Sequence, residues 1–113
     1  MRVLIIDPNP WWQDTVAQRI GITLPGHHSF DRITGWLPHG TVEERVDLVV
    51  VAGLFSPSRG AFAGSIKEGP DIIRLLRRNR VLGAIVLISA DESKRRDALL
   101  AGANAVCSRA HFY

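Results

Sequence analysis

Three short aliphatic runs constrain the fold of this chain more than any other feature. They are residues 2–6 (RVLII), 47–52 (DLVVVA) and 84–88 (AIVLI). Each has the length of one strand, and none alternates apolar with polar residues as a strand with one solvent-facing side would. Such runs are typical of a parallel sheet that is covered by helices on both faces. They therefore predict an α/β fold.

The segments between these runs carry helix signals. A first helix is expected to begin near Pro10 and to end around Gly21 or the following Leu24-Pro25-Gly26, with Val16 and Ile20 as its apolar anchors. A later helix is expected to open at Pro70-Asp71. Its predicted apolar stripe consists of Ile72, Ile73, Leu75 and Leu76.

A last helix is predicted from Asp91, as its cap, to Ala101, with Gly102 ending it. Three of its residues are expected to face the core: Ala98, Leu99 and Ala101. Weaker signals indicate an edge-like strand over 28–33, a short capped helix at 41–44 and a final strand at 105–107.

The resulting order is β-α-β-α-β-α-β-α-β, which predicts a doubly wound parallel sheet of five strands in one domain, residues 1–113. The chain stops at Tyr113, soon after the fifth strand. A further helix, which would follow that strand and cover the sheet, is therefore expected to be missing. The missing helix would leave an apolar edge that favours self-association.

Composition narrows the functional classes. Hydrophobic residues make up 46% and charged residues 22%, without a membrane-length apolar run or a signal-peptide pattern, so a soluble cytoplasmic protein is expected. Cys107 is the single cysteine, and the four histidines lack a metal-ligand spacing, so neither a metal nor another cofactor is predicted. The net charge is +3, and the basic residues gather late in the chain. We interpret them as solvated helix faces and not as a nucleic-acid site: Arg74, Arg77, Arg78, Arg80, Lys94, Arg95 and Arg96.

Four segments together resemble the receiver domain of bacterial response regulators. RVLIIDPNP resembles the family's first strand and acidic turn, and VDLVVVAG its third strand. GPDIIRLLRRNRVLGAIVLISA resembles the third helix and fourth strand, and AGANAVCSRAHF the last turn and fifth strand. The resemblance implies a flavodoxin-like, receiver-type fold.

The resemblance also implies that the phosphorylation site of a receiver is vestigial here. Asp7 matches the first of two acidic residues that hold Mg²⁺, but Pro8 replaces the second. Ala52 replaces the aspartate that accepts the phosphoryl group, Ser89 matches the hydroxyl residue, and Arg109 replaces the lysine. Alanine offers no nucleophile and proline no side-chain oxygen, so neither aspartyl phosphate nor a magnesium site is expected.

The two remaining charges of this pocket suggest a hypothesis. Asp7 and Arg109 could form a salt bridge that locks one conformational state, because a buried carboxylate is costly without a partner. The alternative is that the two residues are remnants that never touch.

A second group of residues is a candidate interaction site: Trp11, Trp12, Lys94, Arg95 and His111. Adjacent tryptophans cannot both face the core, so one is expected at the surface, where tryptophan is enriched in interfaces.

The function predicted from these features is a pseudo-receiver that works without phosphorylation, as a regulatory protein-interaction or dimerisation domain. Its expected partners are another protein, a second copy or an attached output domain. The alternative is a small-molecule or anion sensor that uses the Gly/Ser-rich loop 53–69 and the acidic pocket.

Overall fold

The computed structural model describes residues 1–7, 9–33, 46–52, 69–78 and 80–108. Its strands form one sheet and have these bounds: β1 (Arg2–Ile6), β2 (Ser29–Ile33), β3 (Leu48–Ala52), β4 (Ala84–Ile88) and β5 (Ala105–Cys107). The strand order is β2-β1-β3-β4-β5, and every neighbouring pair is parallel. The three aliphatic runs are the three central strands. The predicted five-stranded parallel sheet is thus confirmed, with the strand order of a flavodoxin-like fold.

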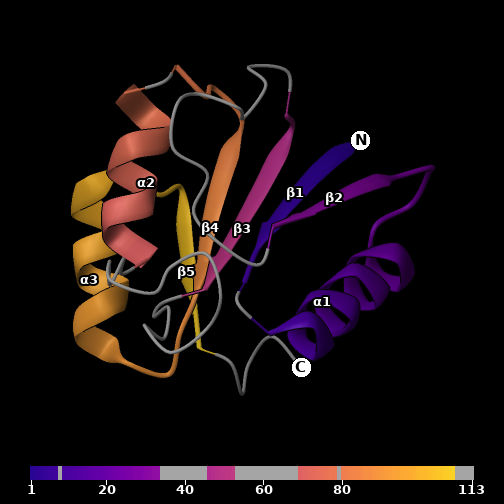
Figure 1. Ribbon diagram of the computed structural model, residues 1–113, viewed down its shortest axis with the longest axis horizontal. Coiled ribbons are helices and arrows are strands. Elements are labelled where there is room, and N and C mark those ends of the chain that lie inside the picture. Colours follow the sequence, from indigo (N-terminus) through magenta and orange to yellow (C-terminus); the bar gives the residue numbers. More distant parts are fainter. Residues whose placement is uncertain (8, 34–45, 53–68, 79, 109–113) are drawn as a thin grey trace.

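Three helices of the described part of the chain cover the sheet: α1 (Pro10–Thr23), α2 (Gly69–Arg78) and α3 (Glu92–Ala101). The helix α1 lies on one face of the sheet, and α2 and α3 lie side by side on the other (Figure 1). The helix expected at 41–44 and the segment after Ser108, where a last helix was predicted to be missing, lie outside the described residues. Within those residues, no helix has both the length and the apolar character needed to cross a membrane.

Local signals place the ends of two helices. The Asn9 side chain accepts a hydrogen bond from the Trp11 N–H and caps α1. The Asp91 side chain caps α3 as predicted, and Gly102 ends that helix with a φ of 118°, in the left-handed region where glycine is favoured.

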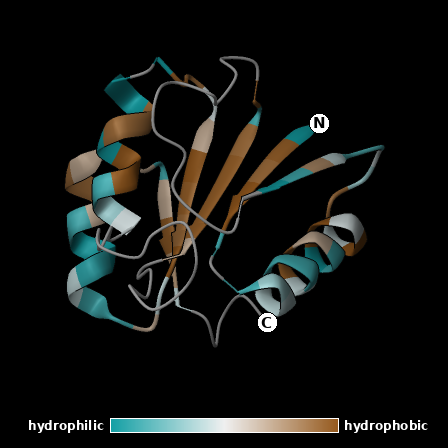
Figure 2. Ribbon diagram, in the orientation of Figure 1, coloured by the Kyte–Doolittle hydropathy of each residue, from teal (hydrophilic) through white to brown (hydrophobic). Residues whose placement is uncertain are grey.

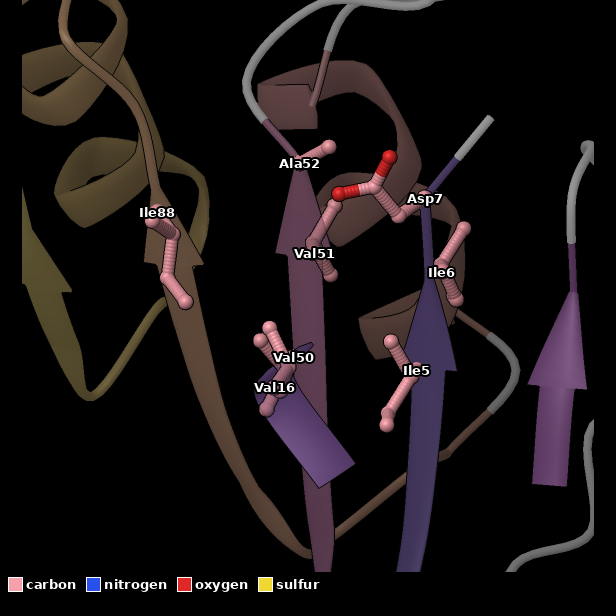
Figure 3. Close-up of a pocket in the computed structure, with 8 residues that line it drawn as sticks. All are labelled: Ile5, Ile6, Asp7, Val16, Val50, Val51, Ala52 and Ile88. Atoms are coloured by element: carbon pink, nitrogen blue, oxygen red, sulfur yellow. The ribbon is translucent and has the colours of Figure 1, made fainter. Parts of the chain in front are cut away.

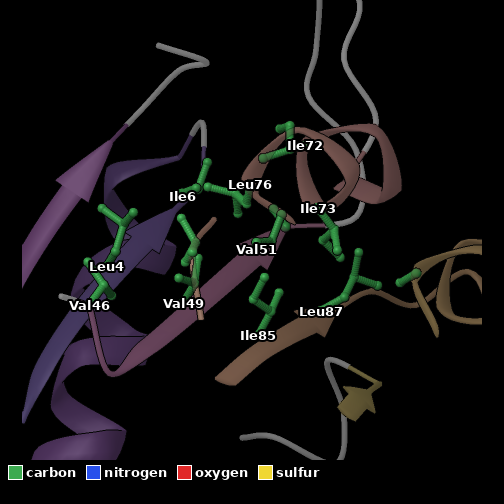
Figure 4. Close-up of a cluster of buried hydrophobic side chains, with 13 residues drawn as sticks. Leu4, Ile6, Val46, Val49, Val51, Ile72, Ile73, Leu76, Ile85 and Leu87 are labelled. Carbon is green, nitrogen blue, oxygen red and sulfur yellow. The ribbon is translucent and has the colours of Figure 1, made fainter. Parts of the chain in front are cut away.

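The main core lies between the sheet and the α2–α3 layer (Figure 4). Strand residues such as Val49, Val51, Ile85 and Leu87 are completely buried there. Figure 2 shows the apolar colouring of the strands under this layer. The members that α2 and α3 contribute are Ile72, Ile73, Leu76 and Ala98.

One predicted core residue is wrong. Leu99 is 50% exposed, whereas Ala98 is completely buried and Ala101 packs partly against the core. Successive helical residues point about 100° apart, and the buried direction of α3 runs through Ala98. Leu99 and Leu100 therefore both lie outside the packed stripe.

The amino ends of the strands are joined by one arginine. Arg77, at the end of α2, donates to the carbonyl oxygens of Val81, Gly83 and Gly102 at 2.7–3.1 Å. It also donates to Oδ1 of Asn104 at 2.7 Å, and that oxygen accepts a further hydrogen bond from the Ile85 N–H. The prediction that Arg77 belongs to a solvated helix face is therefore wrong, because its guanidinium links α2 to the turns before β4 and β5.

Gly83 completes this edge. A Cβ atom on residue 83 would collide with the backbone carbonyl of Val46, and the Asp47 carbonyl is also within 2.9 Å. The Ala84 N–H donates to that same Asp47 oxygen at 3.0 Å. Only glycine lets the turn before β4 approach the start of β3 this closely.

Candidate functional site

The carboxyl ends of three adjacent strands bring together three residues of the predicted pocket. Asp7 follows β1, Ala52 ends β3 and Ser89 follows β4. All three are buried, with exposed fractions of 7%, 4% and 8%. In open α/β sheets this is the edge where ligands bind. The fold therefore gathers the predicted site residues that it describes.

The Asp7 carboxylate is held by the turn between β1 and α1. Its Oδ1 accepts a hydrogen bond from the Asn9 N–H at 2.9 Å. Gln13, buried on α1, donates from Nε2 to the Asp7 carbonyl at 2.8 Å. Sequence reasoning missed Gln13, although a polar residue between the apolar positions of a helix next to a predicted acidic turn is a usable signal. The first bond orients the carboxylate, and the second anchors the backbone of Asp7 to α1.

A small cavity separates Asp7 from its neighbours. It measures ≈ 10 Å³, about the space of a single water. Aliphatic side chains from β1, β3, β4 and α1 line it together with Ala52 and Asp7, and Figure 3 shows the Asp7 carboxylate turned toward Ala52. Asp7 is the one ionisable group in this lining. The cavity lies among core side chains below the strand ends.

The Ser89 hydroxyl is engaged in the turn between β4 and α3. Its Oγ accepts a hydrogen bond from the Asp91 N–H at 3.1 Å, and its carbonyl accepts one from Arg95 at 2.8 Å. Asp91 in turn accepts from the Ser93 hydroxyl at 2.7 Å and from the Ser93 N–H at 2.9 Å. The hydrogen bond from the Ser93 side chain, followed by that from its backbone N–H, lowers the pKa of Asp91 below its usual value.

The described residues hold no cluster of three or more His, Cys, Asp or Glu side chains that could bind a metal ion. Ala52 supplies no nucleophile, and Asp7 is a single carboxylate. Pro8 and Arg109 of the predicted pocket lie outside the described residues, and so does almost all of the 53–69 loop, of which only the buried Gly69 is described.

The residues of the predicted interaction site do not lie together in the structure. Trp11 is 62% exposed and Trp12 half-buried, and their rings meet edge to face at 4.5 Å between centroids. This confirms that one of the two faces solvent. Lys94 and Arg95 are half-buried on the first turns of α3, so they sit with Ser89 and not with the tryptophans. His111 lies outside the described residues.

At the level of sequence, neither a known protein family nor a curated protein matches this chain. Solved structures do match its fold. A response regulator from Burkholderia pseudomallei, solved with a phosphorylated aspartate, a calcium ion and citrate, superposes with a TM-score of 0.73 at 15% identity, over 96% of this chain and 59% of the other. The chain therefore spans less than two thirds of that regulator.

Two further matches have the same architecture. The BeF3-activated receiver domain of RstA from Klebsiella pneumoniae gives a TM-score of 0.66 at 19% identity, over 96% of this chain and 86% of the other. A receiver protein from Pseudoalteromonas atlantica gives 0.70 at 8% identity, over 97% and 85%. The fold and the strand order define an α/β domain of the flavodoxin-like class. Within that class, this chain has the fold of a response-regulator receiver domain.

Proposed function

We propose that this chain is a cytoplasmic pseudo-receiver, a regulatory domain that binds a protein partner without being phosphorylated. The observation that carries the proposal is Ala52. It occupies the carboxyl end of β3, between the ends of β1 and β4, where the family resemblance assigns the phosphate-accepting aspartate. A methyl group cannot form an acyl phosphate. The domain would then act through binding and not through chemistry.

The immediate surroundings of Ala52 support the same proposal. Phosphoryl transfer requires a hard cation and fixed positive charge around the transferred group. The lining of the adjacent cavity contains one carboxylate and otherwise apolar side chains, and Ser89 Oγ already serves the β4–α3 turn. We infer that this pocket has become part of the core.

The outer side of α3 and β5 is the docking surface in this proposal. Leu99 and Leu100 are 50% and 80% exposed, and Arg96 lies one turn before them on the same side of the helix. Residues 91–108 contain three Lys and Arg and three Asp and Glu, so this surface has no net charge. Exposed leucines on a helix without net positive charge favour a protein partner with a partly apolar surface over a nucleic acid.

The proposal is tested by adding beryllofluoride and Mg²⁺, which mimic an acyl phosphate, while recording tryptophan fluorescence. Trp11 and Trp12 begin the helix that follows Asp7, so they report on this edge. We expect no saturable change in the wild type. The variant Ala52→Asp is the matched comparison, because it returns a carboxylate to the end of β3.

The outcomes separate clearly. A saturable, magnesium-dependent change in the wild type would show that a phosphate site survives, and the proposed function would be wrong. A change that occurs only in Ala52→Asp would show that the wild type does not respond because residue 52 is not an aspartate. Intact mass after incubation with acetyl phosphate provides the second measurement, and the wild type should gain no phosphoryl group.

A further inference from the structure

The helix α3 meets the core through small side chains. Ala98 is completely buried, and Ala101 and the following Ala103 pack partly against the core. The neighbouring helix α2 contributes three large aliphatic side chains to the same core: Ile72, Ile73 and Leu76. An alanine offers much less apolar area for burial than a leucine or an isoleucine does. Apolar packing therefore fixes the position of α3 less firmly than that of α2.

Arg77 adds a polar connection at the carboxyl end of α3. Its Nε donates to the carbonyl oxygen of Gly102, the C-cap of α3, at 3.0 Å, and its Nη2 donates to Asn104 Oδ1 at 2.7 Å. A Cβ atom on residue 102 would lie 3.0 Å from Cγ of Arg77. The glycine therefore lets the arginine stem pass directly against the end of α3.

The guanidinium group is itself held in place by the turn after α2. Its Nη1 donates to the carbonyl oxygens of Val81 and Gly83 at 2.7 and 3.1 Å. Val81 is completely buried, and Gly83 packs against the start of β3, so these two acceptors are fixed. The N–H donors of an arginine lie in one rigid plane. Two bonds therefore orient the group, and the other two tie down the end of α3.

The surroundings favour a positive charge at this position. The carboxyl end of a helix carries a partial negative charge. Arg77 lies in the last turn of α2 and contacts the C-cap of α3, so its charge is next to two such ends. Asn104 is fixed as well, because its N–H donates to the Ile85 carbonyl at 2.8 Å. A shift of α3 along the sheet would break both Arg77 bonds and would cost little apolar contact.

We propose that Arg77 is a positioning residue that locks α3 in one place on the sheet. The proposal rests on the proposed function for its biological role, because α3 carries Leu99 and Leu100 of the docking surface. The lock presents these two leucines in one orientation, without a phosphorylation step. Arg77 contacts no partner in this scheme and acts only through the position of α3.

NMR relaxation dispersion tests the lock, because it detects microsecond-to-millisecond exchange between two positions of an element. The wild type should show no exchange over Glu92–Ala101. Arg77→Met keeps an aliphatic stem against Gly102 but donates no hydrogen bond. Its amide signals should shift and show exchange in α3 and at the start of β5. Arg74→Met is the matched control on the same helix, since Arg74 forms an exposed ion pair with Asp71, and it should behave as the wild type does.

A second variant, Arg77→Lys, keeps the charge but not the planar set of donors, so it should show the same pattern. Exchange in α3 of the wild type would overturn the proposal, and so would its absence in both variants. Exchange spread equally over β1 and β3 would indicate general loosening and would also overturn it. Loss of the folded state in both variants would mean that the whole fold, and not the position of α3, depends on Arg77. None of these results alters the beryllofluoride titration of the wild type, so the two proposals fail separately.

Discussion

The two ends of the sheet are built differently. At the amino ends of the strands, Arg77 and Asn104 join α2, two turns and β4 through hydrogen bonds between segments far apart in the sequence. At the carboxyl ends, Asp7 and Ser89 accept hydrogen bonds from backbone N–H groups two residues further along the chain. One end is cross-linked by side chains over long distances. At the other, the hydrogen bonds from Asn9 and Asp91 stay within their own turns, and a backbone bond from the Ser89 N–H to the Cys107 carbonyl joins the ends of β4 and β5.

We interpret the amino-end edge as the part of the sheet that stabilises the fold, and the carboxyl-end edge as the part that can vary with function. A cross-linked edge resists change, because a substitution there breaks bonds in several segments at once. Ala52 ends β3 between these two turns, and its buried methyl group needs no hydrogen-bond partner. The fold therefore accommodates it at a position where the family resemblance implies a charged residue.

The largest effect is expected from Arg77→Ala. The substitution removes four hydrogen bonds from a charged donor that is partly buried, and we expect a loss of about 3 kcal/mol in the free energy of unfolding. Denaturant unfolding measures it. Arg74→Ala is the matched control on the same helix, since Arg74 forms only an exposed ion pair with Asp71, and it should change stability by less than about 1 kcal/mol. Equal losses of unfolding free energy in the two variants would mean that the Arg77 hydrogen bonds stabilise the fold no more than an exposed ion pair does. The amino ends of the strands would then have no special role in stability.

A smaller effect is expected at the carboxyl edge. If Asp7 and Arg109 form the salt bridge that the sequence suggests as one of two alternatives, then Asp7→Asn and Arg109→Gln should be coupled by about 1–2 kcal/mol in a double-mutant cycle. Unfolding of the two single variants and the double variant gives the coupling energy. Strict additivity would mean that the two residues do not interact, and that Asp7 belongs only to its own turn.

The smallest effect concerns pH. Because hydrogen bonds from Ser93 lower the pKa of Asp91 in the folded state, the ionised carboxylate stabilises the fold above the unfolded pKa, which is the ordinary Asp value of 3.8. This stabilisation is lost as the pH falls through the lower, folded pKa. The melting temperature of the wild type should therefore drop below pH 4 more steeply than that of Asp91→Asn, which keeps an acceptor oxygen but does not titrate. Parallel curves for the two proteins would contradict the assignment.

The sequence predicts the elements well because their signals are local. Uninterrupted aliphatic runs identify the central strands, and Asp91 and Gly102 mark the ends of α3. Ser89 and Asp7 reach the same edge because parallel strands end together. These inferences need only the periodicity and caps of single segments.

The errors arise where distant contacts decide. Arg77 reads as one of several arginines on a polar helix face, and its acceptors are carbonyl oxygens that no side-chain pattern reveals. Leu99 is misplaced because α3 buries a narrow stripe through Ala98, so a hydrophobic neighbour can remain outside.

The order of the strands has a consequence for biosynthesis. Among the described strands, β1 and β2 are made before the others and are neighbours in the sheet, and β3, β4 and β5 then join one side in the order of their synthesis. No strand has to insert between two that are already paired. The sheet can therefore grow by simple addition: β3 pairs with the free side of β1, β4 and β5 follow outward, and β2 remains the opposite edge.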